Sequence, residues 1–168
     1  MMDYKARILP TRDALSRVQK QGNLDTDVSG IDLVLNLITT ADLIRASIYK
    51  QLTENHGISE GKFALLMSLY GEGATTASDL ALRIGVTPAT VSIMVKRMLA
   101  APEPLISMSI NNDDGRSRLI TLTSVGLELI KQSLPEHFKS VKTFSAVLNE
   151  QERESLITML RKLLRAES

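Results

Sequence analysis

The stretch Thr76–Thr123, TASDLALRIGVTPATVSIMVKRMLAAPEPLISMSINNDDGRSRLITLT, contains the pattern that decides the fold. Its first part has an apolar stripe at helical spacing, formed by Leu80, Ala81 and Ile84. Gly85 follows directly, at the position where a helix commonly ends in the left-handed conformation. The pattern predicts a short first helix that ends in a tight turn.

A second helix begins two residues later. Thr87 is a good N-cap, and Pro88 occupies the first helical position, where its missing N–H costs nothing. The apolar face of this helix then repeats at Val91, Met94, Val95 and Met98. Two helices joined by a short turn that contains glycine are typical of a helix-turn-helix. The alternative is an ordinary helical hairpin inside a core.

A β-hairpin is predicted after these helices. Leu105–Ile110 and Leu119–Leu122 are short β-prone runs, and the polar segment NNDDGRSR between them offers Gly115 for a turn. Arg116 and Arg118 then lie at the hairpin tip, where they can follow a phosphate backbone or enter a narrow minor groove. Two such arginines alone are more often solvated and unimportant. After a helix-turn-helix, they indicate a winged helix-turn-helix that binds DNA.

From about Ile31 to its C-terminus the chain resembles the MarR-type (multiple antibiotic resistance regulator) family of transcription factors. The matching segments are DLA (79–81), VTPATVS (86–92), DGRS (114–117) and LTSVG (122–126). The resemblance implies that Arg116 enters the minor groove and that Asp114 helps to orient the recognition region. It also implies a dimerisation domain made from the terminal helices, and a ligand pocket between that domain and the DNA-binding region.

The predicted DNA contacts lie on both helices of the pair and on the wing. Thr90 and Ser92 can hydrogen-bond to bases or phosphates, and Ala89 or Ile93 can touch a thymine methyl group. Where relatives often carry an arginine, this chain has Ile93, which can instead be half-buried, and the first wing strand carries SMS (107–109) where basic residues are common. The complete predicted set is Thr76, Ser78, Thr87, Ala89, Thr90, Ser92, Ile93, Lys96, Arg97, Arg116 and Arg118, with Asp114 as wing support; Ser78 can equally be only a helix cap.

The predicted fold is mainly α-helical, with a small two- or three-stranded β wing. Residues 1–27 are an N-terminal extension, in which 13–20 form either a short amphipathic helix or no fixed structure. Residues 28–58 and 124–168 form a helical dimerisation region, and residues 59–123 form the winged helix-turn-helix. Within this plan we expect one long helix over 31–55 that Gly57 ends, and a helix over 61–70 that Ser59 caps and that buries Phe63, Leu65, Leu66, Met67 and Leu69. A further helix over 125–134 is capped by Ser124 or Thr123, and Pro135 after it allows a kink or a break.

The composition excludes several classes of function. The 168 residues include no cysteine, so disulfides, thiolate zinc sites and thiol-based sensing are excluded, and a reducing cytoplasm is the expected location. There is no apolar run long enough to span a membrane and no secretory signal. The two histidines, His56 and His137, have no spaced carboxylate partners, so we expect no metal and no cofactor. No catalytic motif with its full context is present, and we expect no enzyme.

The net charge of +1 is low for a DNA-binding protein, and the stretch 76–123 also sums to +1. DNA binding must therefore depend on where the charges lie, and on a homodimer that doubles the number of DNA contacts. We expect modest affinity for a pseudo-palindromic duplex with a steep dependence on salt. The alternative function is a winged-helix adaptor that binds proteins without specific DNA binding, which the near-neutral charge and Ile93 favour.

An effector site is also predicted. An arginine among aliphatic residues suits an aromatic carboxylate or a phenol, the effector type that the family resemblance implies for a repressor of this kind. The predicted lining residues are Asp42, Arg45, Tyr49, Met67 and Tyr70. The alternative is that Arg45 pairs with Asp42, or with an acid of a partner chain, on a solvated surface.

Overall fold

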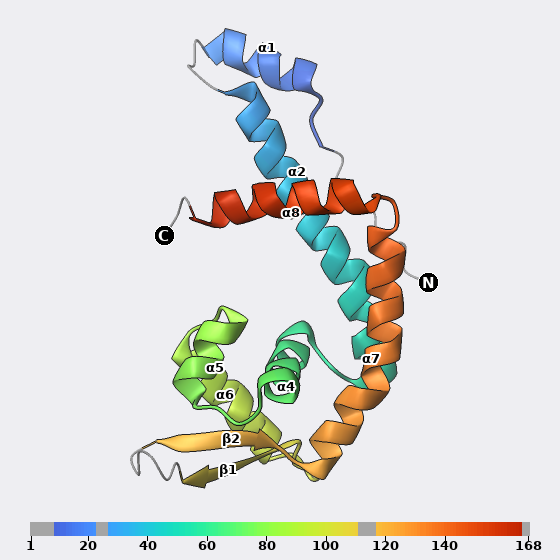
Figure 1. The fold of residues 1–168 in the computed structure, drawn as a ribbon. Coiled ribbons are helices and arrows are strands. Elements are labelled where there is room, and N and C mark those ends of the chain that lie inside the picture. Colours follow the sequence, from blue (N-terminus) through green and yellow to red (C-terminus); the bar gives the residue numbers. More distant parts are fainter. Residues whose placement is uncertain (1–8, 23–26, 111–116, 166–168) are drawn as a thin grey trace. The chain divides into compact units, whose positions relative to one another are not determined.

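The computed structural model describes residues 9–22, 27–110 and 117–165 (Figure 1). The elements follow in the order α1 (Arg12–Gly22), α2 (Val28–Ile44), a π-helical turn (Arg45–Tyr49), α3 (Lys50–His56), α4 (Glu60–Glu72), α5 (Ala77–Ile84), α6 (Pro88–Leu99), β1 (Ile106–Ile110), β2 (Arg118–Leu122), α7 (Ser124–Ser145) and α8 (Glu150–Arg165). The mainly helical fold with a small β wing is therefore confirmed. The chain divides into two compact units, up to Lys50 and from Gln51 onward.

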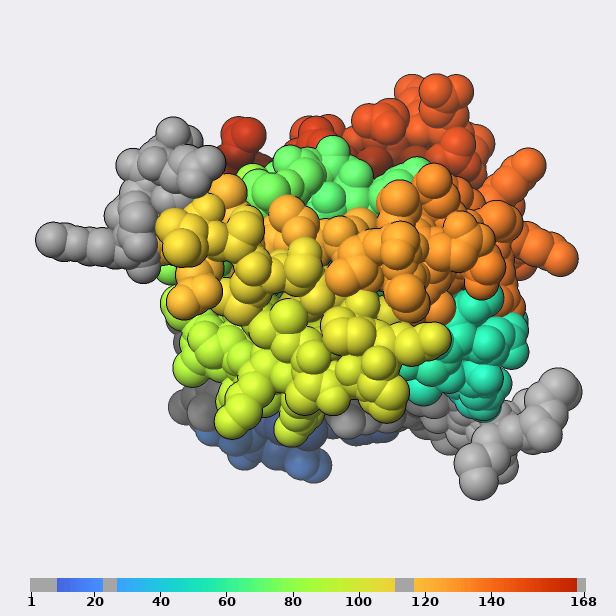
Figure 2. All heavy atoms as spheres, turned by 90° about the horizontal axis from the view of Figure 1, so that it is seen from below, coloured from blue at the N-terminus to red at the C-terminus, as the bar shows by residue number. Residues whose placement is uncertain are grey.

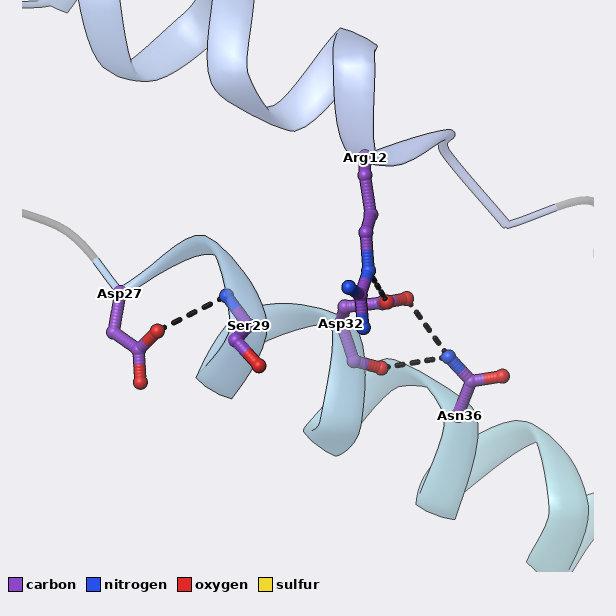
Figure 3. Close-up of polar contacts among 5 residues, drawn as sticks. All are labelled: Arg12, Asp27, Ser29, Asp32 and Asn36. Atoms are coloured by element: carbon purple, nitrogen blue, oxygen red, sulfur yellow. Dashed lines mark hydrogen bonds and ion pairs between the residues drawn. The ribbon is translucent and has the colours of Figure 1, made fainter.

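In the first unit, α1 is fixed to α2 by a polar cluster (Figure 3). The guanidinium Nε of Arg12 donates to the carboxylate of Asp32 at 2.5 Å. The side-chain amide of Asn36 donates to the Asp32 carboxylate at 2.9 Å and to its backbone carbonyl at 2.8 Å. Asp27 caps α2 by accepting the Ser29 N–H at 3.0 Å. Of the two expectations for residues 13–20, the helix is therefore the correct one.

The long helix predicted over 31–55 is present with one correction. The backbone is helical from Val28 to His56, but Arg45–Tyr49 form a π-helical turn. The hydroxyl of Ser47 donates to the Leu43 carbonyl at 2.7 Å and so competes with the backbone N–H groups that a regular α-helix would direct there. Gly57 ends the helix with a φ of 63°, as predicted.

The second unit has an aliphatic core. α4 begins at the predicted cap, Ser59, and buries Phe63, Leu65, Leu66 and Leu69. Met67, expected to be fully buried with them, is only half-buried because it lies on the flank of the helix. The most completely buried side chains of the core are Leu52, Ile58, Leu65, Leu66, Leu80, Val91, Ile106, Ile120 and Ile130.

α7 is longer than the predicted helix over 125–134, because it runs without a break through Pro135, from Ser124 to Ser145. Pro135 and Lys131 are both exposed, so the Lys131 carbonyl, which loses its helical N–H partner, faces water. α7 is tied to α3, since Glu136 accepts the Asn55 side-chain amide at 2.6 Å and lies 3.1 Å from His56 Nε2. The His137 ring packs on Phe63 of α4 with centroids 4.4 Å apart, and burial lowers the pKa of His137.

Candidate nucleic-acid interface

The two helices of the predicted helix-turn-helix are formed by local signals that the sequence already shows. Thr76 caps α5, since its hydroxyl accepts the Asp79 N–H at 3.2 Å and donates to the Asp79 carboxylate at 2.8 Å. At the other end, Gly85 has φ 68° and ψ 37°, and the Val86 N–H reaches back to the Ala81 carbonyl at 3.1 Å. This is a left-handed helix end, and it turns the chain within a few residues.

α6 starts at once after this turn. Thr87 accepts the Thr90 N–H at 3.2 Å, and Pro88 occupies the first turn as predicted. α5 and α6 are bent by 110° relative to each other, within the range of DNA-binding helix-turn-helix pairs. Within the described ranges, no single helix is both long and apolar enough to cross a membrane; only this bent pair, taken together, reaches that length and composition.

The faces of α6 are sharply divided. Val91, Val95 and Met98 are buried against the core. The predicted contact residues of α6 all lie on the exposed face: Ala89, Thr90, Ser92, Ile93, Lys96 and Arg97. Ile93 is 53% exposed, so it does not pack inside the helix pair. A helix with one apolar face in the core and one polar face outward is what a recognition helix requires.

The hydroxyl groups on α6 have defined orientations. The Ser92 hydroxyl donates to the Pro88 carbonyl at 2.9 Å, which leaves its oxygen lone pairs directed outward as acceptors. The hydroxyls of Thr87 and Thr90 share one hydrogen bond of 2.9 Å. On α5, the cap is Thr76 and not Ser78, which is exposed. Thr76 and Ser78 therefore lie together at the N-terminus of α5, but only Thr76 is committed to the cap.

The wing is an antiparallel pair in which Ile106 lies opposite Leu122 and Ile110 opposite Arg118. Thr75 forms an isolated antiparallel bridge with Ile120, so the wing has two strands and one bridging residue, in agreement with the predicted two or three strands. Arg118 is described and exposed at the start of β2. Arg116 and Asp114 lie outside the described residues.

α6 and the wing form one continuous surface. Figure 2 shows this face, where the yellow-green and yellow surface of α6 and β1 adjoins the orange surface of the chain that follows the wing. A groove of about 300 Å³ is lined by residues of α5, α6 and the wing: Ala77, Ser92, Val95, Lys96, Leu99, Met108 and Ile120. Ser92 and Lys96 of α6 are therefore neighbours of the wing strand residue Met108.

The charges are distributed unevenly over this region. Arg83 forms an ion pair with Glu72 at 3.0 Å, so its charge is already matched within the protein. Among the described residues, Lys96 and Arg97 have no acid partner within 4.0 Å, and both are exposed. Although the net charge of the region is small, the outer face of α6 therefore carries two cationic side chains that are available to bind DNA phosphates.

The comparisons with known proteins agree with this geometry. Residues 58–117 match the model of the MarR family. Over this segment, the chain is similar to MarR-family proteins. One similar protein is the HTH-type transcriptional repressor YetL of Bacillus subtilis, which is 27% identical over 136 residues, 80% of each chain.

Two solved structures have a fold similar to that of this chain. Bordetella bronchiseptica BpsR is 26% identical, with a TM-score of 0.66 over 78% of this chain and 98% of its own; its DNA binding is regulated by 6-hydroxynicotinic acid. Streptomyces coelicolor Sco3205, solved in complex with DNA, has a TM-score of 0.77 over 84% of this chain and 89% of its own; at 19% identity, it supports the fold alone.

Sequence reasoning missed several contacts of this region. The Glu72–Arg83 ion pair and the Thr75–Ile120 bridge join residues far apart in sequence, and no local pattern marks them. Thr123, one of the two predicted caps, does cap α7. Its hydrogen bond to the Pro104 carbonyl and the close approach of Gly126 to Leu105 were not predicted.

The five predicted effector residues are divided between the two units. Asp42, Arg45 and Tyr49 belong to the first unit, and half-buried Met67 and exposed Tyr70 belong to the second. A guanidinium nitrogen of Arg45 lies 3.5 Å from the Asp42 carboxylate, as the solvated alternative expects. The effector site stays a prediction.

Proposed function

We propose that this protein is a MarR-family transcriptional regulator that binds pseudo-palindromic duplex DNA as a homodimer, and that it represses transcription. The observation that carries the proposal is the exposed polar face of α6, which adjoins the wing and bears Lys96 and Arg97. The similar proteins named as an HTH-type transcriptional repressor and as an HTH-type transcriptional regulator support this function.

On this proposal, α6 lies in the major groove. The Ser92 hydroxyl, which already donates to Pro88, accepts a hydrogen bond from adenine N6 or cytosine N4. Ala89 and Ile93 contact thymine methyl groups, so the exposure of Ile93 requires no protein partner. Lys96 and Arg97 lie one turn farther along and neutralise phosphates.

A homodimer doubles these contacts. The outer side of α8 exposes apolar residues that one chain leaves uncovered: Leu156, Met159, Leu163 and Leu164. In the first unit, α2 likewise exposes Leu33, Val34 and Ile38. Burying such faces against a second copy follows from the hydrophobic effect. Two-fold symmetry then places two recognition helices about 34–36 Å apart, in successive major grooves.

The effector is proposed to be an aromatic carboxylate or a phenol. The regulation of BpsR by 6-hydroxynicotinic acid, an aromatic carboxylate, supports this class. Binding of such an anion by Arg45 must compete with Asp42, which lies 3.5 Å from that guanidinium. The effector would act by changing the separation of the two recognition helices, because both must meet their grooves together.

The test is the salt dependence of DNA binding. Lys96→Ala removes one phosphate contact per chain, or two per dimer, and should make the slope of log K against log salt shallower by about 1.8. Lys139→Ala, which removes the same charge from an exposed position on α7, is the matched control and should leave the slope unchanged. Equal slopes for the wild type and for Lys96→Ala would contradict the assignment of α6 to the groove.

A further inference from the structure

The Thr123 side chain, which lies between β2 and α7, makes hydrogen bonds on both sides of the wing base. Its backbone N–H donates to the Leu105 carbonyl at 3.0 Å. Its hydroxyl donates to the Pro104 carbonyl at 2.7 Å and accepts the Gly126 N–H at 3.1 Å. One residue therefore fixes the chain that enters β1, the end of β2 and the first turn of α7.

The first turn of α7 lies directly against the same segment. Gly126 is buried, and a Cβ atom at its position would lie 1.9 Å from the Leu105 carbonyl oxygen. Only a glycine permits this approach without a shift of the backbone. The Thr123 hydrogen bonds therefore hold two chain segments that are already in close contact, and this gives the wing base a single geometry.

β2 is anchored to the helix-turn-helix as well. Ile120 and Thr75 exchange two backbone hydrogen bonds of 2.8 and 3.2 Å, and both residues are buried. The next residue after Thr75 is Thr76, which caps α5. The strand that carries Arg118 is thus tied to α5 through Thr75 and to α7 through Thr123.

We propose that Thr123 is a positioning residue that sets the orientation of the wing toward DNA, so that Arg118 reaches the DNA backbone while α6 occupies its groove. This inference rests on the proposed function. Thr123 itself is at the root of the hairpin and is not proposed to touch DNA. Without its hydroxyl, the wing base loses the hydrogen bonds to the Pro104 carbonyl and from the Gly126 N–H, while the backbone hydrogen bond to Leu105 remains. The orientation of β2 is then less well fixed, and Arg118 contacts DNA less often.

A double-mutant cycle tests the proposal on the full-length chain, with DNA from upstream of its own gene as the probe. Thr123→Val keeps the shape and removes the hydroxyl, whereas Thr123→Ser keeps the hydroxyl. We expect Thr123→Val and Arg118→Ala each to weaken selective binding about tenfold, equivalent to about 1.4 kcal/mol. The double variant should be little weaker than either single variant, because both changes remove the same wing contact. Thr123→Ser should bind like the wild type.

Several results overturn the inference. The first is an affinity about a hundredfold lower in the double variant, which would mean that the two losses are independent. The second is an unchanged DNA affinity of Thr123→Val. The third is a lower affinity of Thr123→Val together with an unchanged affinity of Arg118→Ala. If Thr123→Val does not fold, Thr123→Ala is the second hydroxyl-free variant for the same cycle. A wild-type chain that binds no DNA selectively overturns the proposed function itself, which separates that failure from failure of the positioning role.

Discussion

The substitution Gly126→Ala tests the close contact at the wing base most severely. The added Cβ atom would lie 1.9 Å from the Leu105 carbonyl oxygen and 2.9 Å from its carbon, where ordinary contact begins at 3.4 Å. The backbone must therefore open by about 1.5 Å at this point. Such overpacking costs about 1–3 kcal/mol in folded proteins.

The same movement disrupts the hydrogen bond from Thr123 N–H to the Leu105 carbonyl, which is 3.0 Å long. Its loss costs about 0.5–1.5 kcal/mol more. The helix propensity of alanine returns at most about 1 kcal/mol in the first turn of α7. We therefore expect a net loss of about 2–3 kcal/mol in the free energy of unfolding, or about 4–12 °C in melting temperature for a chain of this size.

The assay is thermal unfolding followed by circular dichroism at one fixed protein concentration, because a dimer's melting temperature depends on concentration. Gly71→Ala is the matched control: Gly71 is in the last turn of α4, and a Cβ atom there would meet nothing within 4 Å. The control should be unchanged or slightly stabilised. A melting temperature for Gly126→Ala equal to that of Gly71→Ala would refute the reasoning.

Three further predictions concern stability. Thr76→Ala removes the cap of α5 and should cost about 1 kcal/mol in urea unfolding, whereas Ser78→Ala should cost nothing, and equal losses would contradict the assignment of the cap. Gly85→Ala places a side chain at φ 68° and should destabilise by about 1 kcal/mol in the same assay; an unchanged midpoint would contradict the strained turn. Burial lowers the pKa of His137 below 6.5, so the unfolded chain binds more protons, and stability that is complete above that pH declines as the pH falls. His137→Gln should therefore reduce the change of melting temperature with pH between about pH 5 and 7.5, and a pH dependence equal to that of the wild type would contradict the lowered pKa of the half-buried His137.

The helix-turn-helix could be predicted from the sequence because its signals are local. The caps Thr76 and Thr87 and the positive φ of Gly85 depend on residues within a few positions, and each is found where the pattern indicates. The wing strands were predicted within one residue of their ends, because their β-prone runs flank a polar turn segment.

The contacts that fix the wing could not be predicted in the same way. The Thr75–Ile120 pairing and the approach of Gly126 to Leu105 join segments separated by about 20 to 45 positions, and only tertiary packing brings them together. The π-helical turn at Arg45–Tyr49 and the continuous helix through Pro135 also depart from local expectation. The predicted wing residues Asp114 and Arg116 lie outside the described residues, so their roles stay predictions.

The central claim is that this chain recognises DNA sequence through α6 and the wing. Its most direct test is a fluorescence-anisotropy titration of the wild-type protein against duplex DNA from upstream of its own gene, with a scrambled duplex of the same length as competitor. The account predicts selective, salt-sensitive binding to the upstream duplex, with two chains on each site and little competition from the scrambled sequence. Equal and weak binding to both duplexes would contradict it.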